Sequence, residues 1–395
     1  MKVLRAGEGV SLVRDVLIPM RDGVRLAADV RPALSPQGDP MGSPTPALDP
    51  DGPLELISAR TLFTDAPLGR RSAASVVRLA STGRLLMCYS HVVGAALRNQ
   101  AALLLTHSDD DGVTWAEPLP LYASPGWFSL AMGGLARIAD DNVKVLLGRI
   151  RLDLSLGGTE PMTGWYVASA TSRDGGDTWS EPSPEIRLFP EWTELYGASN
   201  PHPLADGRLL WAVMGTLGRD VGWHAGVSRS DAAGEHFEPP TIIARADDRD
   251  YSDIDLARLD DGRFLAVVRE HRTRQSVWST SGDEGATWSP TRPTAFKGSN
   301  IKLFRLRSGA IACAYRDEDP DRRGVSISLT RDGGESWTSL GQLYAAGPEA
   351  LHEPGSVCGY PDLVSLGGDE IGAVLHTYPT ADGTQLQWLR LRDRS

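Results

Sequence analysis

The stretch SRDGGDTW at Ser172–Trp179 decides the fold of this 395-residue chain, because close copies of it recur along the sequence. Each intact copy has Ser or Thr at its first and seventh positions, Asp at its third, Gly at its fifth and Trp at its eighth. The intact copies are Ser108–Trp115, Ser172–Trp179, Ser281–Trp288 and Thr330–Trp337, and a decayed copy is Ser230–Phe237. Their first residues lie about 49 to 64 positions apart, which is the period of a β-propeller blade or a similar repeated unit.

The spacing inside the motif is typical of a hairpin turn. A short Asp side chain can accept hydrogen bonds from backbone N–H groups, Gly adopts positive φ, and the Ser and Thr hydroxyls can bond locally. The Trp can cover the turn from the adjoining core. We therefore interpret the motif as part of the fold. The acidic run Asp109–Asp111 favours calcium only weakly, because the ligand spacing and terminal Glu of an EF-hand are missing.

Six further segments repeat with a similar period. In each, apolar residues alternate, break at a polar or Gly turn and resume, as in a pair of antiparallel strands. The segments are Val76–Tyr89, Leu135–Gly148, Pro203–Met214, Leu256–Val268, Leu303–Tyr315 and Leu363–Leu375. Six such strand pairs predict an all-β chain folded as a six-bladed β-propeller. The absence of a sixth motif predicts a ring closed by pairing the two ends of the chain in one blade.

The eight-residue motif resembles the Asp box of the sialidase superfamily, and we call each copy a box. The resemblance covers roughly residues 55 to 395. It implies a six-bladed propeller with the boxes on its outer rim, far from the active site. It also implies an active site at the central end of the ring, on loops that follow the inner strands.

Composition narrows the partners and the cellular setting. A net charge of -11 without blocks of like charge argues against nucleic acid and against an anionic membrane surface. No apolar run predicts a transmembrane helix and no signal peptide is evident, so we expect a cytoplasmic protein. Cys88, Cys313 and Cys358 have no metal-ligand spacing and are expected to be reduced thiols in the core. We expect neither a metal nor a cofactor.

The first residues do not follow the repeat. Val13–Val30 predicts a β-hairpin that turns at Asp22–Gly23, and it resembles the opening hairpin of the cocaine-esterase and X-Pro-peptidase group of α/β-hydrolases. No G-x-S-x-G nucleophile motif follows, so that chemistry is not carried over. We expect an appended hairpin at residues 1–31, a linker at 32–53 with Met41 as an alternative start, and the propeller at 54–395.

The sialidase resemblance implies a Tyr nucleophile activated by a carboxylate, because the carboxylate of a sialoside would repel an anionic nucleophile. Tyr360 matches the family's Tyr before the last inner hairpin, although Pro361 replaces the usual Ser. Asp253 matches the position of the activator, six residues before Leu259. The family has Glu there, and Asp is shorter by one methylene. Asp255 is an alternative activator.

Three Arg side chains bind the substrate's carboxylate in the family, since a guanidinium binds a planar anion through two hydrogen bonds. Arg269 and Arg322 match two of them by their spacing from neighbouring repeats, and Arg323 is adjacent to Arg322. Ser72 takes the position of the third, with Arg71 one residue out of register. A shift by one residue turns a strand side chain to the opposite face of the sheet. Arg71 can therefore act as the third carboxylate-binding Arg only if a β-bulge in the strand restores the face.

The family's general acid, an Asp, has no counterpart here, because Ser90–Ala101 contains neither Asp nor Glu. His91 can titrate near neutrality and is the candidate acid, and His202 is a second candidate. Together these residues favour a glycoside hydrolase of the sialidase superfamily that acts on a terminal acidic or unusual sugar. Two alternatives stay open: a propeller that binds glycans without cleaving them, and a polysaccharide lyase that uses Tyr and His on a uronate.

Overall fold

The computed structural model describes most of the chain. The described residues are 16–19, 25–28, 46–63, 69–93, 101–122, 127–130, 134–139, 141–152, 162–186, 188, 194–197, 199–216, 222–232, 234–244, 250–347, 358–378 and 383–395. The chain divides into two compact units, Met1–Ser43 and Pro44–Ser395. In the first unit, β1 (Val16–Pro19) and β2 (Arg25–Ala28) pair antiparallel. The predicted turn at Asp22–Gly23 lies outside the described residues.

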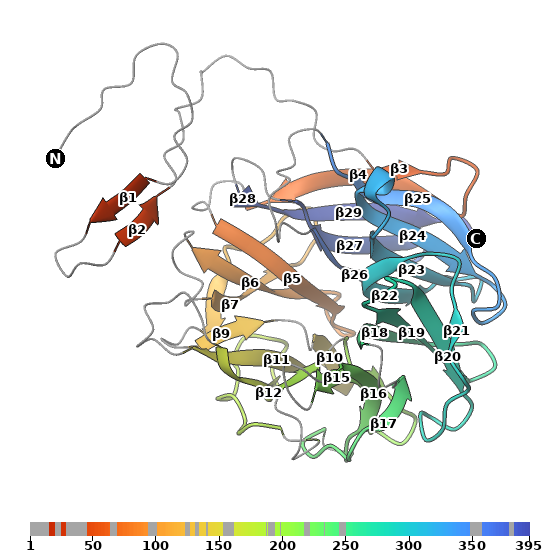
Figure 1. Cartoon of the computed structure of the whole chain (residues 1–395), viewed down its shortest axis with the longest axis horizontal. Coiled ribbons are helices and arrows are strands. Elements are labelled where there is room, and N and C mark those ends of the chain that lie inside the picture. The colour runs from red at the N-terminus through yellow and green to blue at the C-terminus, as the bar shows by residue number, and fades with distance from the viewer. Residues whose placement is uncertain are drawn as a thin grey trace, which may run out of the picture. The chain divides into compact units, whose positions relative to one another are not determined.

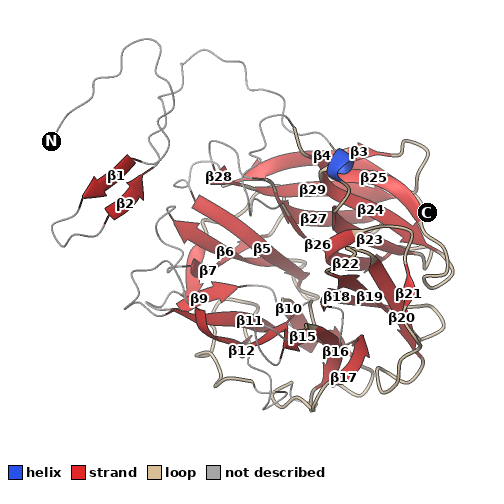
Figure 2. Ribbon diagram, viewed as in Figure 1, coloured by secondary structure: helices blue, strands red, loops and turns tan. Residues whose placement is uncertain are grey.

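The second unit is a six-bladed β-propeller, as the repeats predict (Figure 1). Its blades are antiparallel sheets whose first strands surround a central axis. Strands make up nearly all of the regular structure (Figure 2), and the described residues include one 3₁₀ helix at Pro320–Arg322. Within these residues, no helix could cross a membrane.

The first three blades are joined by short strands into one continuous sheet. Blade 1 consists of β5 (Gly69–Arg78), β6 (Leu85–Val93), β7 (Ala101–Ser108) and β8 (Leu119–Tyr122). Blade 2 consists of β10 (Leu135–Ala139), β11 (Asn142–Leu152) and β12 (Met162–Ser172). Blade 3 consists of β14 (His202–Pro203), β15 (Leu209–Thr216), β16 (His224–Arg229) and β17 (Thr241–Ala244). The connecting strands are β9 (Trp127–Leu130), between blades 1 and 2, and β13 (Glu194–Gly197), between blades 2 and 3.

The last three blades are separate sheets. Blade 4 consists of β18 (Tyr251–Arg258), β19 (Phe264–Glu270), β20 (Ser276–Ser281) and β21 (Arg292–Pro293). Blade 5 consists of β22 (Gly298–Arg305), β23 (Ile311–Asp317), β24 (Gly324–Thr330) and β25 (Thr338–Ala345). Blade 6 consists of β26 (Gly359–Gly367), β27 (Glu370–His376), β29 (Leu386–Asp393) and β4 (Leu54–Leu62). In addition, β3 (Ala47–Leu48), within the stretch predicted as a linker, pairs with β25, and β28 (Gly383–Thr384) pairs with β5.

The ring closes through the two ends of the propeller sequence. β4, from the beginning of the propeller, pairs antiparallel with β29, its last strand, along the whole length of both strands. This confirms the predicted closure. Because the outer strand of blade 6 comes from the other end of the chain, blade 6 cannot form before both ends meet.

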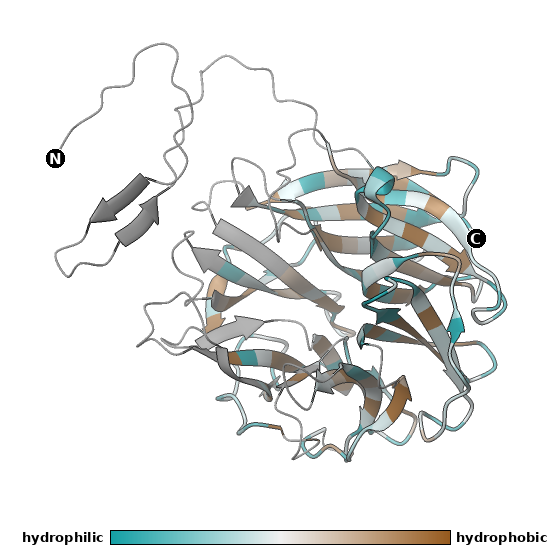
Figure 3. Cartoon of the chain, in the orientation of Figure 1, coloured by the Kyte–Doolittle hydropathy of each residue, from teal (hydrophilic) through white to brown (hydrophobic). Residues whose placement is uncertain are grey.

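Six apolar cores hold the ring together, one at each interface between neighbouring blades. They arise because apolar and polar residues alternate along the strands, as Figure 3 shows for blades 5 and 6. Each face of a blade is thus buried only against its neighbour. The three cysteines are free and buried in these cores, which confirms the prediction of core thiols. Burial raises the pKa of Cys358 to about 12.

The four intact boxes share one pattern of hydrogen bonds in the turn that follows the third strand of a blade. In blade 4, Ser281 Oγ donates to Asp283 Oδ1 and accepts from the N–H of Gly285, both at 2.8 Å. Asp283 also accepts from the N–H of Thr287 at 2.8 Å and from its hydroxyl at 2.6 Å. The other intact boxes repeat these contacts. The box Asp therefore serves the turn.

The aromatic residue of each box packs against the core that its own blade shares with the preceding one. This holds for Trp115, Trp179, Trp288 and Trp337, and also for Phe237 of the decayed box. Three of the indoles donate N–H to the carbonyl of the box Gly. The four indoles therefore occupy equivalent positions, each covering its turn from the adjoining core as the motif predicts.

We predict that Asp283→Asn lowers the Tm by about 2 °C at pH 7, because the amide nitrogen of Asn cannot accept the hydrogen bond that the Thr287 hydroxyl donates to Asp283. The hydrogen bonds from Thr287 and Ser281 hold the pKa of Asp283 at about 2, below its ordinary 3.8. A carboxyl whose pKa is lowered by folding stabilises the fold above its ordinary pKa, and the stabilisation is lost as the pH falls through about 2. The difference in Tm should therefore shrink between pH 4 and pH 2.

Calorimetry across this pH range measures the effect. Glu284→Gln is the control, since it removes the same charge from the same turn and none of the box hydrogen bonds. Equal losses of Tm in the two variants at pH 7 would show that the box hydrogen bonds of Asp283 do not stabilise the fold.

Candidate functional site

Four inner strands, β5, β18, β22 and β26, carry the same irregularity. Each shifts its register against the second strand of its blade, which marks a β-bulge. The first bulged residue has positive φ in every case: 51° at Ala73, 45° at Asp253, 50° at Asn300 and 44° at Tyr360. Positive φ is costly for a residue other than glycine, and such strain concentrates at functional sites. The bulges therefore mark the candidate site.

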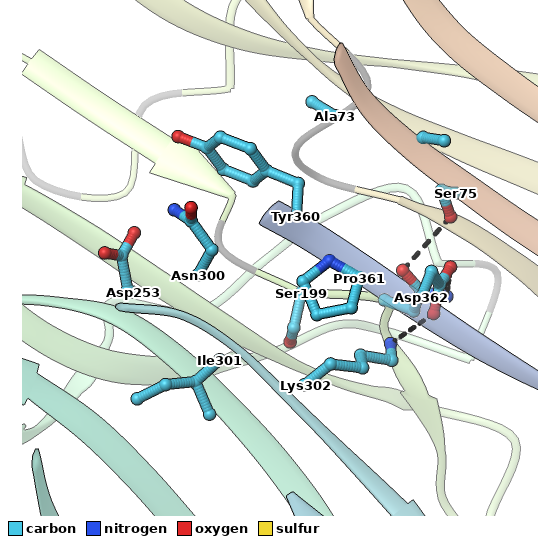
Figure 4. Close-up of a pocket in the computed structure, with 12 residues that line it drawn as sticks. Ala73, Ser75, Ser199, Asp253, Asn300, Ile301, Lys302, Tyr360, Pro361 and Asp362 are labelled. Atoms are coloured by element: carbon cyan, nitrogen blue, oxygen red, sulfur yellow. Dashed lines mark hydrogen bonds and ion pairs between the residues drawn. The ribbon is translucent and has the colours of Figure 1, made fainter. Parts of the chain in front are cut away.

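A cavity of about 40 Å³ lies among these bulges. Asp253, Asn300 and Tyr360 line it with a carboxylate, an amide and a hydroxyl that lie close together in Figure 4. Ser75 and Asp362 lie on the other side of the view. A cavity of this volume has room for about three water molecules, so a larger ligand would contact its mouth.

Below the bulges, five polar side chains form what we call the floor: Ser75, Asn200, Asp255, Lys302 and Asp362. Lys302 Nζ lies 2.9 Å from Asp362 Oδ1 and 3.9 Å from Asp255 Oδ2. Asn200 donates from Nδ2 to Asp362 Oδ2 at 3.1 Å and accepts from Ser75 Oγ at 3.2 Å. Burial alone would lower the pKa of Lys302, but the two carboxylates raise it above its ordinary value.

The floor also links neighbouring blades through backbone hydrogen bonds. Ser75, Asp255 and Asp362 each accept an N–H from the inner strand of the following blade. The pairs are Leu135 N–H to Ser75 at 2.9 Å, Leu303 N–H to Asp255 at 2.7 Å and Val76 N–H to Asp362 at 2.8 Å. The last of these joins blade 6 to blade 1. Gly134 makes room for the floor, because a Cβ there would lie 2.0 Å from the Oδ1 of Asn200.

Two arginines flank the bulges from equivalent positions near the ends of the second strands β19 and β23. Arg269 pairs in register with the residue before Asp253, and its Nη1 lies 3.1 Å from Asp253 Oδ2. Arg316 holds the same register position in blade 5 and lies beside Gly359, where a Cβ would be 3.3 Å from the Cβ of Arg316. Arg316 therefore adjoins the backbone that carries Tyr360.

Glu318 connects these guanidinium groups. Its carboxylate lies 3.2 Å from Arg269 Nη2, 3.5 Å from Arg316 Nη2 and 3.6 Å from Arg274 Nη1. Ser299 Oγ donates to it at 2.6 Å. Burial alone would raise the pKa of Glu318, but the Ser299 hydrogen bond and the three guanidinium groups hold it below its ordinary value. Glu318 therefore stays ionised and orients both flanking arginines.

Three residues predicted from the sequence meet here. Tyr360 and Asp253 line the cavity, and Arg269 is bound to Asp253. Asp255, the alternative activator, is fully buried in the floor, where it accepts a backbone N–H. Its carboxylate therefore serves the packing of blades 4 and 5.

Arg322 and Arg323 are not among the residues that line the cavity. Arg322 Nε is 3.4 Å from Asp317, and its Nη2 contacts the hydroxyls of two serines in blade 5. Arg323 stacks over the ring of Tyr378 at 4.4 Å. A role for Arg322 in binding an anion stays a prediction, and the structure places Arg316 beside the backbone that carries Tyr360.

The remaining predicted residues lie at the first and third blades. β5 carries the bulge that the assignment of Arg71 required, although the side chain of Arg71 is outside the described residues. His91 is half-buried on β6 and pairs in register with Arg71. His202 is packed edge-on against Phe264, and burial lowers its pKa. The roles of Arg71, His91 and His202 stay predictions.

Sequence reasoning missed Arg316, Asn300 and the floor. A signal for Arg316 was present, since Val267-Val268-Arg269 and Ala314-Tyr315-Arg316 occupy the same place in successive repeats. Asn300 stands six residues before Leu306, as Asp253 stands six before Leu259. In the part of the chain that the structure describes, no group of three or more His, Cys, Asp or Glu side chains is arranged to hold a metal.

Comparison with known proteins agrees with this fold. Residues 148–373, more than half of the chain, match the family model of the BNR repeat-like domain. The chain belongs to this family. No curated protein matches this BNR repeat-like chain by sequence.

Solved structures with the same fold include proteins of different activities. One is a protein of unknown function from Dyadobacter fermentans (16% identity, TM-score 0.71, covering 86% of this chain and 99% of that one). Another is the NanB sialidase of Streptococcus pneumoniae (15% identity, TM-score 0.59, covering 86% of this chain and 71% of that one). A third is an α-L-arabinanase of Penicillium chrysogenum (13% identity, TM-score 0.59, covering 86% of this chain and 99% of that one). At these identities the likeness shows the fold alone.

We predict that Lys302→Met destabilises the BNR repeat-like propeller by about 3–5 kcal/mol, because it leaves the carboxylates of Asp255 and Asp362 buried without their cation. Urea unfolding measures the change. Lys297→Met, at an exposed lysine of the same blade, is the control and should stay within about 0.5 kcal/mol of the wild type. A Lys302→Met protein as stable as this control would show that the floor does not depend on the ion pair.

Proposed function

We propose that this chain is a glycoside hydrolase that acts on a terminal sugar bearing a carboxylate. The observation that carries the proposal is the setting of Tyr360. A carboxylate, Asp253, lines the same cavity, and two arginines, Arg269 and Arg316, flank it. This combination suits a substrate that carries a carboxylate. The arginines can bind that carboxylate, and the neutral phenol of Tyr360 is not repelled by it as an anionic nucleophile would be.

The charges near the cavity favour an anion. Three guanidinium groups, those of Arg269, Arg274 and Arg316, share two carboxylates, those of Asp253 and Glu318. This arginine cluster thus carries one net positive charge, whereas the floor, with Lys302, Asp255 and Asp362, carries one net negative charge. An anion is therefore favoured on the arginine side of the cavity. Glu318 orients Arg269 and Arg316 in advance, so that less conformational freedom is lost when a ligand's carboxylate binds.

In the proposed reaction, the phenol oxygen of Tyr360 attacks the anomeric carbon, and its proton passes to Asp253. The bond to the leaving oxygen breaks, and that oxygen takes a proton from an acid, for which His91 is the candidate. Water then attacks the anomeric carbon and gives its proton to the same acid's conjugate base. Tyr360 leaves and recovers its proton from Asp253.

Glycan binding without hydrolysis is the second candidate function. It is favoured by the absence of Asp and Glu from Ser90–Ala101, where the sialidase pattern has its acid. Under this alternative the cavity and the two arginines would bind an acidic sugar, and no bond would be cleaved. The polysaccharide lyase alternative has no such support.

Tyr360→Phe should abolish the cleavage of 4-methylumbelliferyl glycosides while changing the affinity for the sugar by less than about threefold, because the hydroxyl is needed for the covalent step. The panel contains α-N-acetylneuraminide, β-glucuronide, β-galactoside and α-L-arabinofuranoside. Tyr122→Phe is the control, since its hydroxyl bonds to a carbonyl in a neighbouring blade outside the cavity. Full turnover by Tyr360→Phe would exclude the mechanism. Sugar binding by a wild type that cleaves nothing would favour the second candidate.

Arg269→Lys and Arg316→Lys should each raise KM for an acidic glycoside about tenfold, because Lys keeps the charge but cannot form two parallel hydrogen bonds with a carboxylate. Steady-state kinetics on the acidic and neutral members of the panel measures the change. Arg292→Lys, which alters an exposed ion pair with Glu335, is the control. A KM that rises equally for acidic and neutral sugars would show that these arginines do not bind the carboxylate.

A further inference from the structure

Asn300 is the polar residue of the cavity that the proposed mechanism does not use. In Figure 4 its amide lies between the carboxylate of Asp253 and the ring of Tyr360. All three residues are the first residues of equivalent bulges in successive blades, and all three have positive φ. The strained conformation thus places an amide beside the two groups proposed to react.

The amide oxygen of Asn300 is buried and unsatisfied by the fold. The residue is 6% exposed, and its Oδ1 accepts no hydrogen bond from any residue that the structure describes. Folding normally pairs buried polar atoms, because an unpaired one is costly. Here Oδ1 is buried beside Gly359, where a Cβ would lie 2.7 Å away, but the residue lines the cavity, and a ligand can supply the missing donor once the amide turns towards it.

The neighbours of Asn300 in the same bulge are committed to the structure. Ser299 donates its hydroxyl to Glu318, Ile301 packs in the core between blades 4 and 5, and Lys302 belongs to the floor. Blade 1 has Ala73 at the equivalent position with φ of 51°. The bulge therefore forms without a polar side chain at this position. Positive φ favours Asn over most residues, but it neither requires the amide nor pairs its oxygen.

We propose that Asn300 determines specificity by accepting a hydrogen bond, through Oδ1, from a ring hydroxyl of the sugar bound at Tyr360 and Asp253. The inference rests on the proposed function, because it takes the anomeric carbon to lie at Tyr360. The inference adds that one ring hydroxyl of the bound sugar points towards Asn300 in blade 5. A site built to bind such a hydroxyl discriminates strongly against the analogue that lacks it.

Asn300→Ala and Asn300→Gly test this role. The alanine variant repeats the residue found at position 73, and the glycine variant removes the strain of positive φ. Both should raise KM about tenfold for the glycoside of the panel that the wild type cleaves. No hydrogen bond within the fold is lost, so the Tm of the glycine variant should be unchanged or higher, and that of the alanine variant should fall by no more than about 2 °C, because Ala tolerates positive φ less well than Asn. Asn142→Ala, at the start of β11, is the control for loss of an amide elsewhere.

The outcomes separate the two proposals. If the wild type cleaves or binds a panel sugar and both Asn300 variants match it within twofold, the role of Asn300 is overturned and the proposed function stands. A fall in Tm of several degrees in both variants would assign Asn300 to the fold instead. If titration calorimetry finds that the wild type binds neither N-acetylneuraminic acid nor glucuronic acid, and it cleaves no glycoside, the proposed function fails together with the role of Asn300.

Discussion

The contact between Lys302 and Asp362 at the centre of the ring is the interaction on which the rest of the structure depends. Asp362 accepts hydrogen bonds from the backbone of blade 1 and from Asn200 of blade 3, and it binds Lys302 of blade 5. One carboxylate of blade 6 thus fixes three other blades. Buried charges are tolerated only when they are paired and hydrogen-bonded, so these blades can pack in one arrangement that satisfies all of the partners. The pairing of β4 with β29 closes the ring at its periphery, and this contact closes it at the axis.

The floor also explains how strained residues are held at the cavity. Asp255, Lys302 and Asp362 each follow a residue with positive φ by two positions, namely Asp253, Asn300 and Tyr360. In each of these strands, the hydrogen bonds or ion pairs of the floor residue fix the end of the bulge, and the apolar core between the blades fixes the rest of the strand. A carboxylate, an amide and a phenol are therefore presented by rigid strands, which is the preorganisation that a binding or catalytic site requires.

The sequence predicted the features that depend on local contacts. Each box makes its hydrogen bonds within eight residues, so its period reveals the blades. Tyr360, Asp253 and Arg269 were found because each lies at a fixed distance from a tight hairpin. Counting eight residues back from the box at Thr330 leads past the start of β24 to Arg322, in the loop between β23 and β24, where no strand register places the side chain. Strand register places Arg316 opposite the bulge instead. The floor was not predicted, because it joins side chains from inner strands that are far apart in the sequence.

The crystal structure of the Tyr360→Phe variant, soaked with the acidic glycoside that binds best, tests the central claim most directly. The account predicts a sugar at the mouth of the cavity, with its carboxylate on Arg269 and Arg316 and a ring hydroxyl within about 3.2 Å of Asn300. A sugar bound with its carboxylate away from both arginines, or bound outside the cavity, would contradict it.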